Sequence, residues 1–120
     1  MHAYSFEKLD VWKEAIKLSV YIYKITQTFP DNEKFGLISQ MRRCSVSISS
    51  NIAEGTARLT NKDKAHFMTL SYSSALEHLN QAIITKELEF ISEENYKIIR
   101  FDIESISNKI NALRNHFLKS

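Results

Sequence analysis

The strongest regularity in the chain is a run of apolar residues near its C-terminus, spaced alternately by three and four positions. The run is Tyr96, Ile99, Ile103, Ile106, Ile110, Leu113 and Phe117. Such a seven-residue repeat places all of its members on one stripe of an α-helix, which then packs lengthwise against other helices. The run therefore predicts a helix of about 39 Å. Ser92 is the expected N-cap of this helix.

Helical periodicity recurs in three earlier segments, from about Glu7 to Phe29, Glu33 to Glu54 and Asn61 to Glu89. The expected core stripes of the second and third are Leu37, Met41, Cys44, Ile48 and Ile52, and Ala65, Met68, Tyr72, Leu76, Leu79 and Ile83. With two glycines and one proline, the chain has few of the residues that many turns require. We therefore predict an all-α fold, an up-and-down antiparallel four-helix bundle, with residues 1–120 as a single domain.

The ends of the first three segments carry further signals. Pro30 breaks the first helix, Gly55 is placed for a left-handed C-terminal cap, and Thr60 is placed for an N-cap of the third helix. Residues 45–50 also alternate between polar and apolar, as a strand would. The helical period on both flanks favours the helix.

No catalytic or cofactor site emerges from the motifs. Gly36 and Gly55 are the only glycines, so neither a dinucleotide loop nor a phosphate-binding loop can be written. The lone Cys44 lies on an expected core stripe, where a cysteine behaves as a small hydrophobe rather than a nucleophile. A carboxylate three residues before a histidine occurs once, at Asp63 and His66, and a bundle metal centre needs two such pairs. We expect no enzyme activity, metal or cofactor.

The same features bear on the compartment. A single cysteine excludes an internal disulfide and fits a reducing cytosol. The N-terminus lacks the apolar run of a signal peptide, and no stretch approaches the roughly 18 apolar residues of a membrane helix. We expect a cytoplasmic protein that does not contact membranes.

Two groups of basic residues are candidate nucleic-acid contacts, although the net charge is only +2. Lys13, Lys17 and Lys24 share a helix face with Tyr21, a combination suited to phosphates and a stacked base. The alternative is local ion pairing of Asp10 with Lys13 and of Glu14 with Lys17.

The second group is arginine-rich. Arg42 and Arg43 have no acidic residue within four positions, and Arg58 follows the second helix. Unpaired arginines can bind phosphate with two parallel hydrogen bonds. Alternatively, they pair across the bundle with Glu54 or Glu77.

Polar residues also interrupt the second helix. Asn51 and Glu54 lie near its C-terminal end, where the helix dipole disfavours a carboxylate. Together with Glu77 they are expected to form a structural polar network that fixes helix register. A ligand site is the alternative.

The first helix is more apolar than one packing face requires. Val11, Trp12, Leu18 and the residues from Val20 to Tyr23 are apolar or aromatic, and Phe67 and Leu70 add to this surplus in the third helix. Such a surplus indicates either a protein–protein interface or a thick bundle core.

Four motifs occur in order along the chain and resemble a known family. They are Phe6-x-x-Leu9-x-Val11-Trp12, Phe29-Pro30-x-x-Glu33-x-Phe35-Gly36-Leu37, Gln40-x-Arg42-Arg43 and Asn51-Ile52-Ala53-Glu54-Gly55. Together they resemble the bacterial four-helix-bundle proteins encoded in 23S rRNA intervening sequences, also called S23 ribosomal proteins. Two departures are Ser73 in place of the family's usual glycine and Cys44 in place of its common alanine.

This resemblance implies a ring-shaped homopentamer without catalytic residues. It also implies kinship with accessory proteins of diversity-generating retroelements, which bind reverse transcriptase and nucleic acid. Five copies would carry a charge of about +10, five times the +2 of one chain. We therefore expect a non-enzymatic homo-oligomer that binds structured RNA or DNA. The alternative is a protein-interaction scaffold or accessory subunit, partnered for example by a reverse transcriptase, with no direct nucleic-acid contact.

Overall fold

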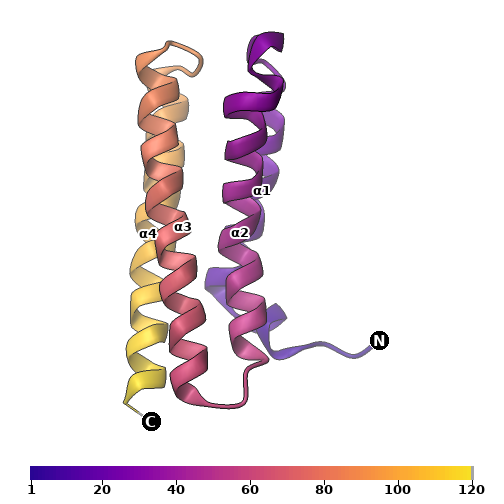
Figure 1. Cartoon of the computed structure of the whole chain (residues 1–120), viewed down its shortest axis with the longest axis vertical. Helices are drawn as coiled ribbons and strands as arrows, with labels where there is room; N and C mark the ends of the chain where they lie inside the picture. The colour runs from indigo at the N-terminus through magenta and orange to yellow at the C-terminus, as the bar shows by residue number, and fades with distance from the viewer. Residues whose placement is uncertain (120) are drawn as a thin grey trace.

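Four long helices that alternate in direction make up most of the protein (Figure 1). The computed structural model describes residues 1–119. The helices are α1 (Asp10–Thr26), α2 (Ser39–Thr56), α3 (Asn61–Glu87) and α4 (Glu93–Leu118). Three short turns of other helical types precede α1 and α2: η1 (Ser5–Lys8), η2 (Asp31–Glu33) and η3 (Lys34–Ile38). The predicted antiparallel four-helix bundle is confirmed.

Consecutive helices pack side by side, and α1 closes the bundle against α4. The contact of α3 with its neighbours α2 and α4 is far more extensive than the contact between α1 and α4. Residues 45–50 lie within α2, so the strand interpretation is wrong. The N-caps predicted at Thr60 and Ser92 are confirmed, since their hydroxyls accept hydrogen bonds from the N–H groups of Asp63 and Asn95 at 3.1 and 3.0 Å.

The core runs the length of the bundle. The C-terminal stripe contributes most to it: Ile99, Ile106 and Ile110 are 0% exposed and Ile103 is 1% exposed. The other large aliphatic and methionine side chains that are fully buried in residues 1–119 come from the remaining three helices: Leu18, Ile22, Met41, Ile48, Ile52 and Met68. Burial on one stripe of each helix is what holds the bundle together.

The first two helices begin later than the sequence indicated. Leu9 has an extended backbone (φ −79°, ψ 126°) that separates η1 from α1. Before α2, the chain forms η2 and then the π-helical η3, whose Gly36 departs from helical geometry (φ −103°, ψ −111°). At the start of both helices, short turns stand where the apolar periodicity predicted a regular first helical turn. Before α2 these turns include Gly36.

The expected left-handed cap at Gly55 is wrong, because α2 continues to Thr56 and no glycine has a positive φ. A Cβ atom at Gly55 would lie 2.8 Å from the Cβ of Phe67 and 2.6 Å from the Cε of Met68. Gly55 is therefore required by the close approach of α2 and α3. Among residues 1–119, the residue with a left-handed backbone is Glu89, which follows α3 (φ 63°).

The core stripe of α3 also differs from the predicted one in its C-terminal half. Ala75, His78 and Ala82 are 0% exposed, whereas Leu76 and Ile83 are 44% and 38% exposed. Because α3 packs closely between α2 and α4, mainly small side chains fit on the faces that it turns toward these two helices. Larger apolar side chains are left on the surface.

Candidate nucleic-acid interface

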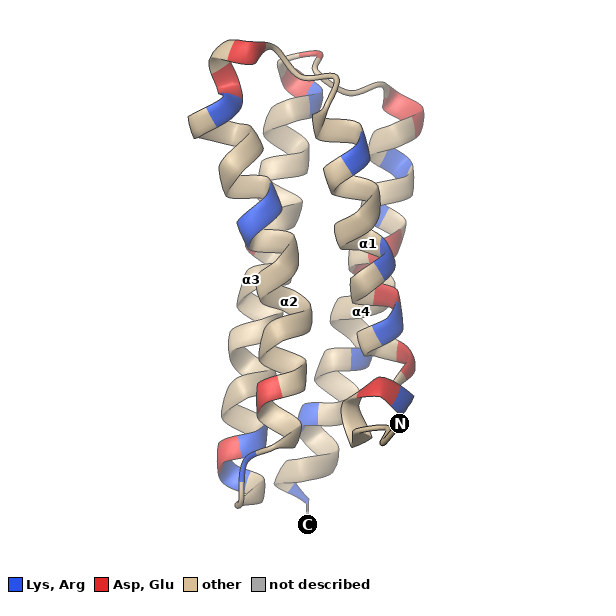
Figure 2. Cartoon of the chain, turned by 90° about the vertical axis from the view of Figure 1, so that its right-hand side faces the viewer, with Lys and Arg blue, Asp and Glu red and all other residues tan. Residues whose placement is uncertain are grey.

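The basic face predicted on the first helix lies on the outside of α1. Lys13, Lys17 and Lys24 are all exposed and fall within one arc of the helix surface. We call these residues the α1 lysine face. Figure 2 shows basic residues at successive levels of α1.

The ion pairs that were the alternative role for these lysines, Asp10 with Lys13 and Glu14 with Lys17, do not form. The carboxylate of Glu14 accepts hydrogen bonds from Lys109 and, at 2.7 Å, from the hydroxyl of Ser105, both on α4. Burial raises the pKa of Glu14, but the bonds from Lys109 and Ser105, together with the charges of Lys109 and Lys17, outweigh it and hold the pKa below its usual value. Within residues 1–119, none of the three lysines forms an ion pair.

Tyr21 is not available as the interleaved stacking residue. Its hydroxyl donates to the Oδ1 of Asn95 at 3.1 Å, and the ring is half-buried against α4. The α1 lysine face is therefore a row of cationic groups without an aromatic platform of its own.

Arg42 is held by the end of α1. Its Nε donates to the Thr26 hydroxyl at 2.9 Å, and its Nη2 donates to the Tyr23 carbonyl at 3.2 Å. The guanidinium also lies 4.7 Å from the centre of the Tyr23 ring. Arg42 thus satisfies a carbonyl near the C-terminus of α1, where a cation is favoured by the helix dipole.

The other two arginines occupy different parts of the surface. Arg43 is exposed beside the α2–α3 contact and forms no ion pair with Glu54 or Glu77 among the described residues. Arg58 follows α2 and stacks over Phe67 at 4.8 Å. The length of α2 separates Arg58 from Arg43, so the candidate basic residues do not form one continuous patch.

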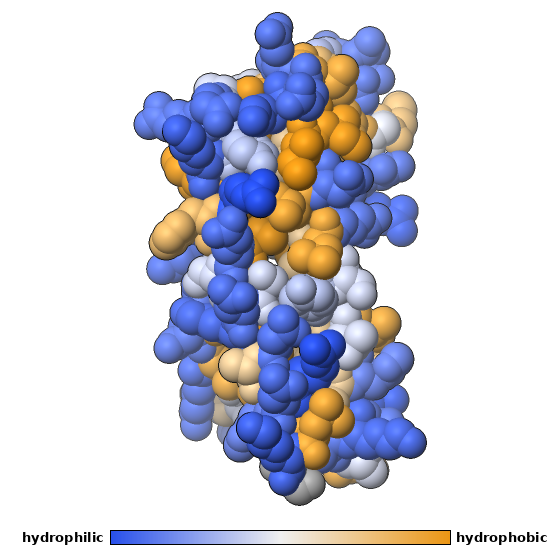
Figure 3. Space-filling model, turned by 90° about the vertical axis from the view of Figure 1, so that its left-hand side faces the viewer, coloured by the Kyte–Doolittle hydropathy of each residue, from blue (hydrophilic) through white to orange (hydrophobic). Residues whose placement is uncertain are grey.

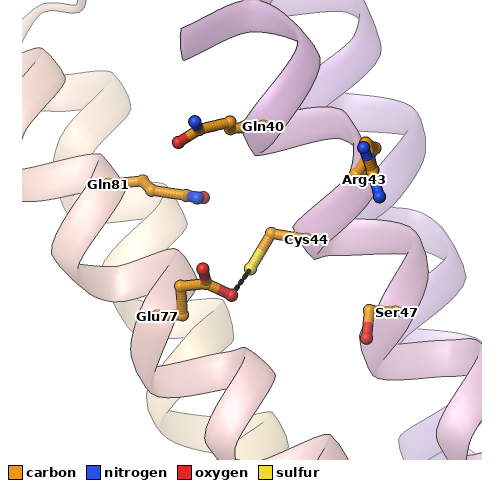
Figure 4. Close-up of a pocket in the computed structure, with 6 residues that line it drawn as sticks. All are labelled: Gln40, Arg43, Cys44, Ser47, Glu77 and Gln81. Carbon is orange, nitrogen blue, oxygen red and sulfur yellow. Dashed lines mark hydrogen bonds between the residues drawn. The ribbon is translucent and has the colours of Figure 1, made fainter. Parts of the chain in front are cut away.

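A polar groove of about 290 Å³ lies between α2 and α3 (Figure 4). Its lining residues are Gln40, Arg43, Cys44, Ser47, Glu77 and Gln81. Gln40 and Gln81 extend toward each other, and the Cys44 thiol points at Glu77. The thiol donates to the Glu77 carboxylate at 3.4 Å and to the Ser74 carbonyl at 3.1 Å.

The predicted polar network is assembled only in part. Asn51 donates to the carbonyl and the hydroxyl of Ser47 at 2.9 and 3.1 Å, and Ser47 bonds to the Ser74 hydroxyl at 2.9 Å. Asn51 and Glu77 therefore belong to the same α2–α3 seam. The Glu54 side chain is exposed, and its carboxylate makes no hydrogen bond or ion pair with any described residue.

His78 was missed by the sequence analysis. It is 0% exposed, and its Nδ1 lies 3.2 Å from the Oε1 of Gln81. Burial lowers the pKa of His78, so its imidazole is neutral at physiological pH. In the sequence, Leu76 and Leu79 predicted a different buried face of this helix. No local signal therefore marked His78 as buried.

The thiol of Cys44 is suppressed as a nucleophile. Burial, followed by the hydrogen bond and the charge of Glu77, raises its pKa to about 12. Because thiolates are the reactive form, we expect native Cys44 to react with DTNB about a thousandfold more slowly than in denaturant, where its pKa is about 8.5. Similar rates for native and denatured protein would contradict the buried, hydrogen-bonded thiol.

A second, apolar groove of about 430 Å³ separates α1 from α2. Its lining includes Ile16, Val20, Tyr23 and Val46, which are 36%, 49%, 43% and 40% exposed. Hydrophobic side chains also gather on the opposite side of the molecule, in the half near the α3–α4 connection (Figure 3). Exposed Leu76, Ile83, Ile98 and Phe101 add to the apolar surface of α3 and α4.

Two kinds of feature are absent from residues 1–119. No group of three or more His, Cys, Asp and Glu side chains is arranged to hold a metal ion. None of the helices in this range combines the length and hydropathy that crossing a bilayer requires.

These features define a class of protein: an antiparallel four-helix bundle with a basic face on α1 and apolar surface on several helices. The family model of the 23S rRNA-intervening sequence proteins matches residues 7–112, and the chain belongs to this family. The fold matches a protein of unknown function from the S23 ribosomal protein family of Bacteroides thetaiotaomicron VPI-5482, with a TM-score of 0.78 and 21% identity. That match covers 87% of this chain and 97% of the other. No curated protein matches the sequence.

Proposed function

We propose that this protein is a non-enzymatic homo-oligomer of the cytoplasm that binds structured RNA through its phosphate backbone. The observation that carries the proposal is the α1 lysine face. Three exposed lysines lack ion pairs because Glu14, the nearest acid on their helix, is bound to α4. The family's association with 23S rRNA intervening sequences supports RNA as the nucleic acid.

The spacing of these lysines suits a phosphate backbone. At 1.5 Å per residue, Lys13 and Lys17 are about 6 Å apart along α1, and Lys17 and Lys24 about 10 Å apart. Ammonium groups on long, flexible side chains act as point charges that contact phosphates without reading bases. Arg43, exposed and without an ion pair, adds a separate cationic group on α2.

Assembly would multiply this weak charge. The exposed leucine and isoleucine side chains of α3 leave apolar surface that an oligomer interface would bury. In the pentamer that the resemblance implies, five lysine faces would act together. Multiple weak contacts on one RNA raise the overall affinity well above that of one subunit.

The second candidate function is a protein-interaction scaffold without nucleic-acid contact. The apolar α1–α2 groove favours it, because Ile16, Val20 and Tyr23 offer a partner helix more apolar surface than an RNA would use. In that case, Arg43 and the lysines would form ion pairs between subunits or with the partner.

Charge reversal of the α1 lysine face tests the proposal. We expect Lys13→Glu, Lys17→Glu and Lys24→Glu together to weaken structured RNA binding at low salt at least about tenfold. We also expect the slope of log affinity against log salt to fall by about 2–3, as three phosphate contacts are lost. Fluorescence anisotropy with a labelled rRNA hairpin measures both quantities.

The matched control reverses three exposed lysines elsewhere: Lys62→Glu, Lys97→Glu and Lys119→Glu. This variant has the same net charge and should lose much less affinity. Equal losses in the two variants would assign binding to net charge alone. An unchanged affinity in the α1 variant would refute the α1 lysine face, and light scattering on both variants checks that assembly is intact.

A further inference from the structure

Phe35 is an aromatic ring held out in solvent, 89% exposed. It belongs to η3, the π-helical turn before α2, next to the non-helical Gly36. The carboxylate of Glu33 accepts a hydrogen bond from the N–H of Leu37 at 3.4 Å, which stabilises this turn. The ring is therefore displayed by a defined local structure at the point where α2 begins.

The surroundings of the ring are cationic. A hollow of about 320 Å³ is lined by Tyr23, Lys34, Phe35, Ile38, Ser39, Arg42 and Arg43; we call it the Phe35 hollow. Lys34 lies over the ring with its Nζ 5.6 Å from the centroid. Arg42 is held on Tyr23, and Arg43 forms no ion pair in the described chain. One exposed ring thus shares a hollow with three cations.

This combination fits a nucleotide better than a protein side chain. Lysine is depleted in protein interfaces, and charged residues as a group are depleted at their core, whereas Lys34, Arg42 and Arg43 all lie around Phe35. An exposed aromatic ring beside lysine and arginine is the arrangement that stacks one base and neutralises its phosphate. The nearby carboxylate of Glu33 is turned toward the Leu37 N–H, which reduces its opposition to an anion.

The position of the hollow also favours a single strand over a duplex. Acidic residues occupy the connections at this end of the bundle (Figure 2). The cations of the hollow therefore adjoin acidic connections, an arrangement that suits one or two phosphates rather than a long duplex backbone. In a duplex the bases are stacked on one another, so only an unpaired base can reach Phe35.

We propose that the Phe35 hollow binds one unpaired nucleotide of RNA or DNA, with the base stacked on Phe35 and a flanking phosphate at Arg43 and Lys34. This inference rests on the proposed nucleic-acid binding and adds a preference for single-stranded segments. The α1 lysine face supplies backbone contacts, whereas the Phe35 hollow selects loops, bulges or ends.

Removing the ring tests the proposal in the full-length protein. We expect Phe35→Ala to weaken binding of a labelled single-stranded oligonucleotide of about 12 nucleotides by about tenfold. Binding of a duplex of the same length should change by less than about twofold, because it has no unpaired base to stack. The matched control is Phe101→Ala on α4, which removes another exposed phenylalanine (72% exposed) and should leave both affinities unchanged.

A direct readout of stacking comes from Phe35→Trp, whose added fluorescence should be quenched when the single strand binds. If Phe35→Ala leaves single-strand affinity unchanged while reversal of the α1 lysine face abolishes binding, the inference is wrong and the proposed function stands. If the wild type binds neither nucleic acid at low salt, both fail. A lower oligomer mass for Phe35→Ala would overturn the inference by making Phe35 a contact between copies.

Discussion

Replacing Ile106 by alanine is expected to lower the free energy of unfolding by about 2–5 kcal/mol. Ile106 is 0% exposed, near the middle of the apolar stripe of α4, which packs on α3 and α1. Removing three carbon atoms there loses buried apolar area and leaves a cavity that long, regular helices cannot readily close. Urea denaturation followed by circular dichroism measures the change.

The matched control is Ile98→Ala, the same substitution in the same helix at a residue that is 43% exposed. It should cost less than about 1 kcal/mol, because much of the side chain is already in water. A loss at Ile106 no larger than the loss at Ile98 would contradict the burial of the α4 stripe.

Replacing Gly55 by valine is expected to destabilise the bundle by about 1–3 kcal/mol, although valine favours helix more than glycine does. The new Cβ would be 2.8 Å from the Cβ of Phe67, an atom fixed to the α3 backbone. The Cε of Met68, also too close at 2.6 Å, ends a flexible side chain and can move. The overlap with Phe67 therefore forces α2 and α3 apart.

Ser50→Val is the control for this substitution, since Ser50 is exposed on the same helix and its hydroxyl makes no hydrogen bond to any described residue. It should change stability by no more than about 0.5 kcal/mol. Thermal unfolding should show a lower midpoint for Gly55→Val only. Increased stability in that variant would mean that α2 and α3 are not as close at Gly55 as the structure has them.

The sequence predicted the architecture well because α4 has a single clear stripe and the capping residues at Thr60 and Ser92 act locally. It failed in α3, where apolar residues occur all around the helix. In such a helix the periodicity cannot show which face is inside. The burial of Ala75 and Ala82 rather than Leu76 and Ile83 depends on how closely α2 and α4 approach.

For the candidate site, the sequence predicted the shared face of the lysines but not the partners of the neighbouring acids. Glu14 could equally have paired with Lys17 on its own helix. Its choice of Lys109 and Ser105 depends on the packing of α1 against α4. Likewise, the role of Arg42 at the end of α1 requires the turn between α1 and α2, which no local pattern encodes.

The polar seam between α2 and α3 was also predicted only in part. Asn51 donates hydrogen bonds to Ser47, one turn earlier on the same helix, so this contact is local in sequence. Glu77 is linked to α2 by the hydrogen bond that it accepts from Cys44, 33 positions earlier in the chain. This contact depends on the register of α2 against α3. Glu54, although close to Asn51 in sequence, lies on the exposed side of α2.

The proposed function is backbone binding of RNA by an oligomer of this bundle. To test it, the wild-type protein is titrated into labelled rRNA across a range of salt concentrations, with the protein mass measured by light scattering under each condition. We expect an oligomer at every salt concentration and an RNA affinity whose logarithm falls linearly with the logarithm of salt concentration. An intact oligomer that leaves rRNA unbound at the lowest salt would refute the proposed function and favour the scaffold.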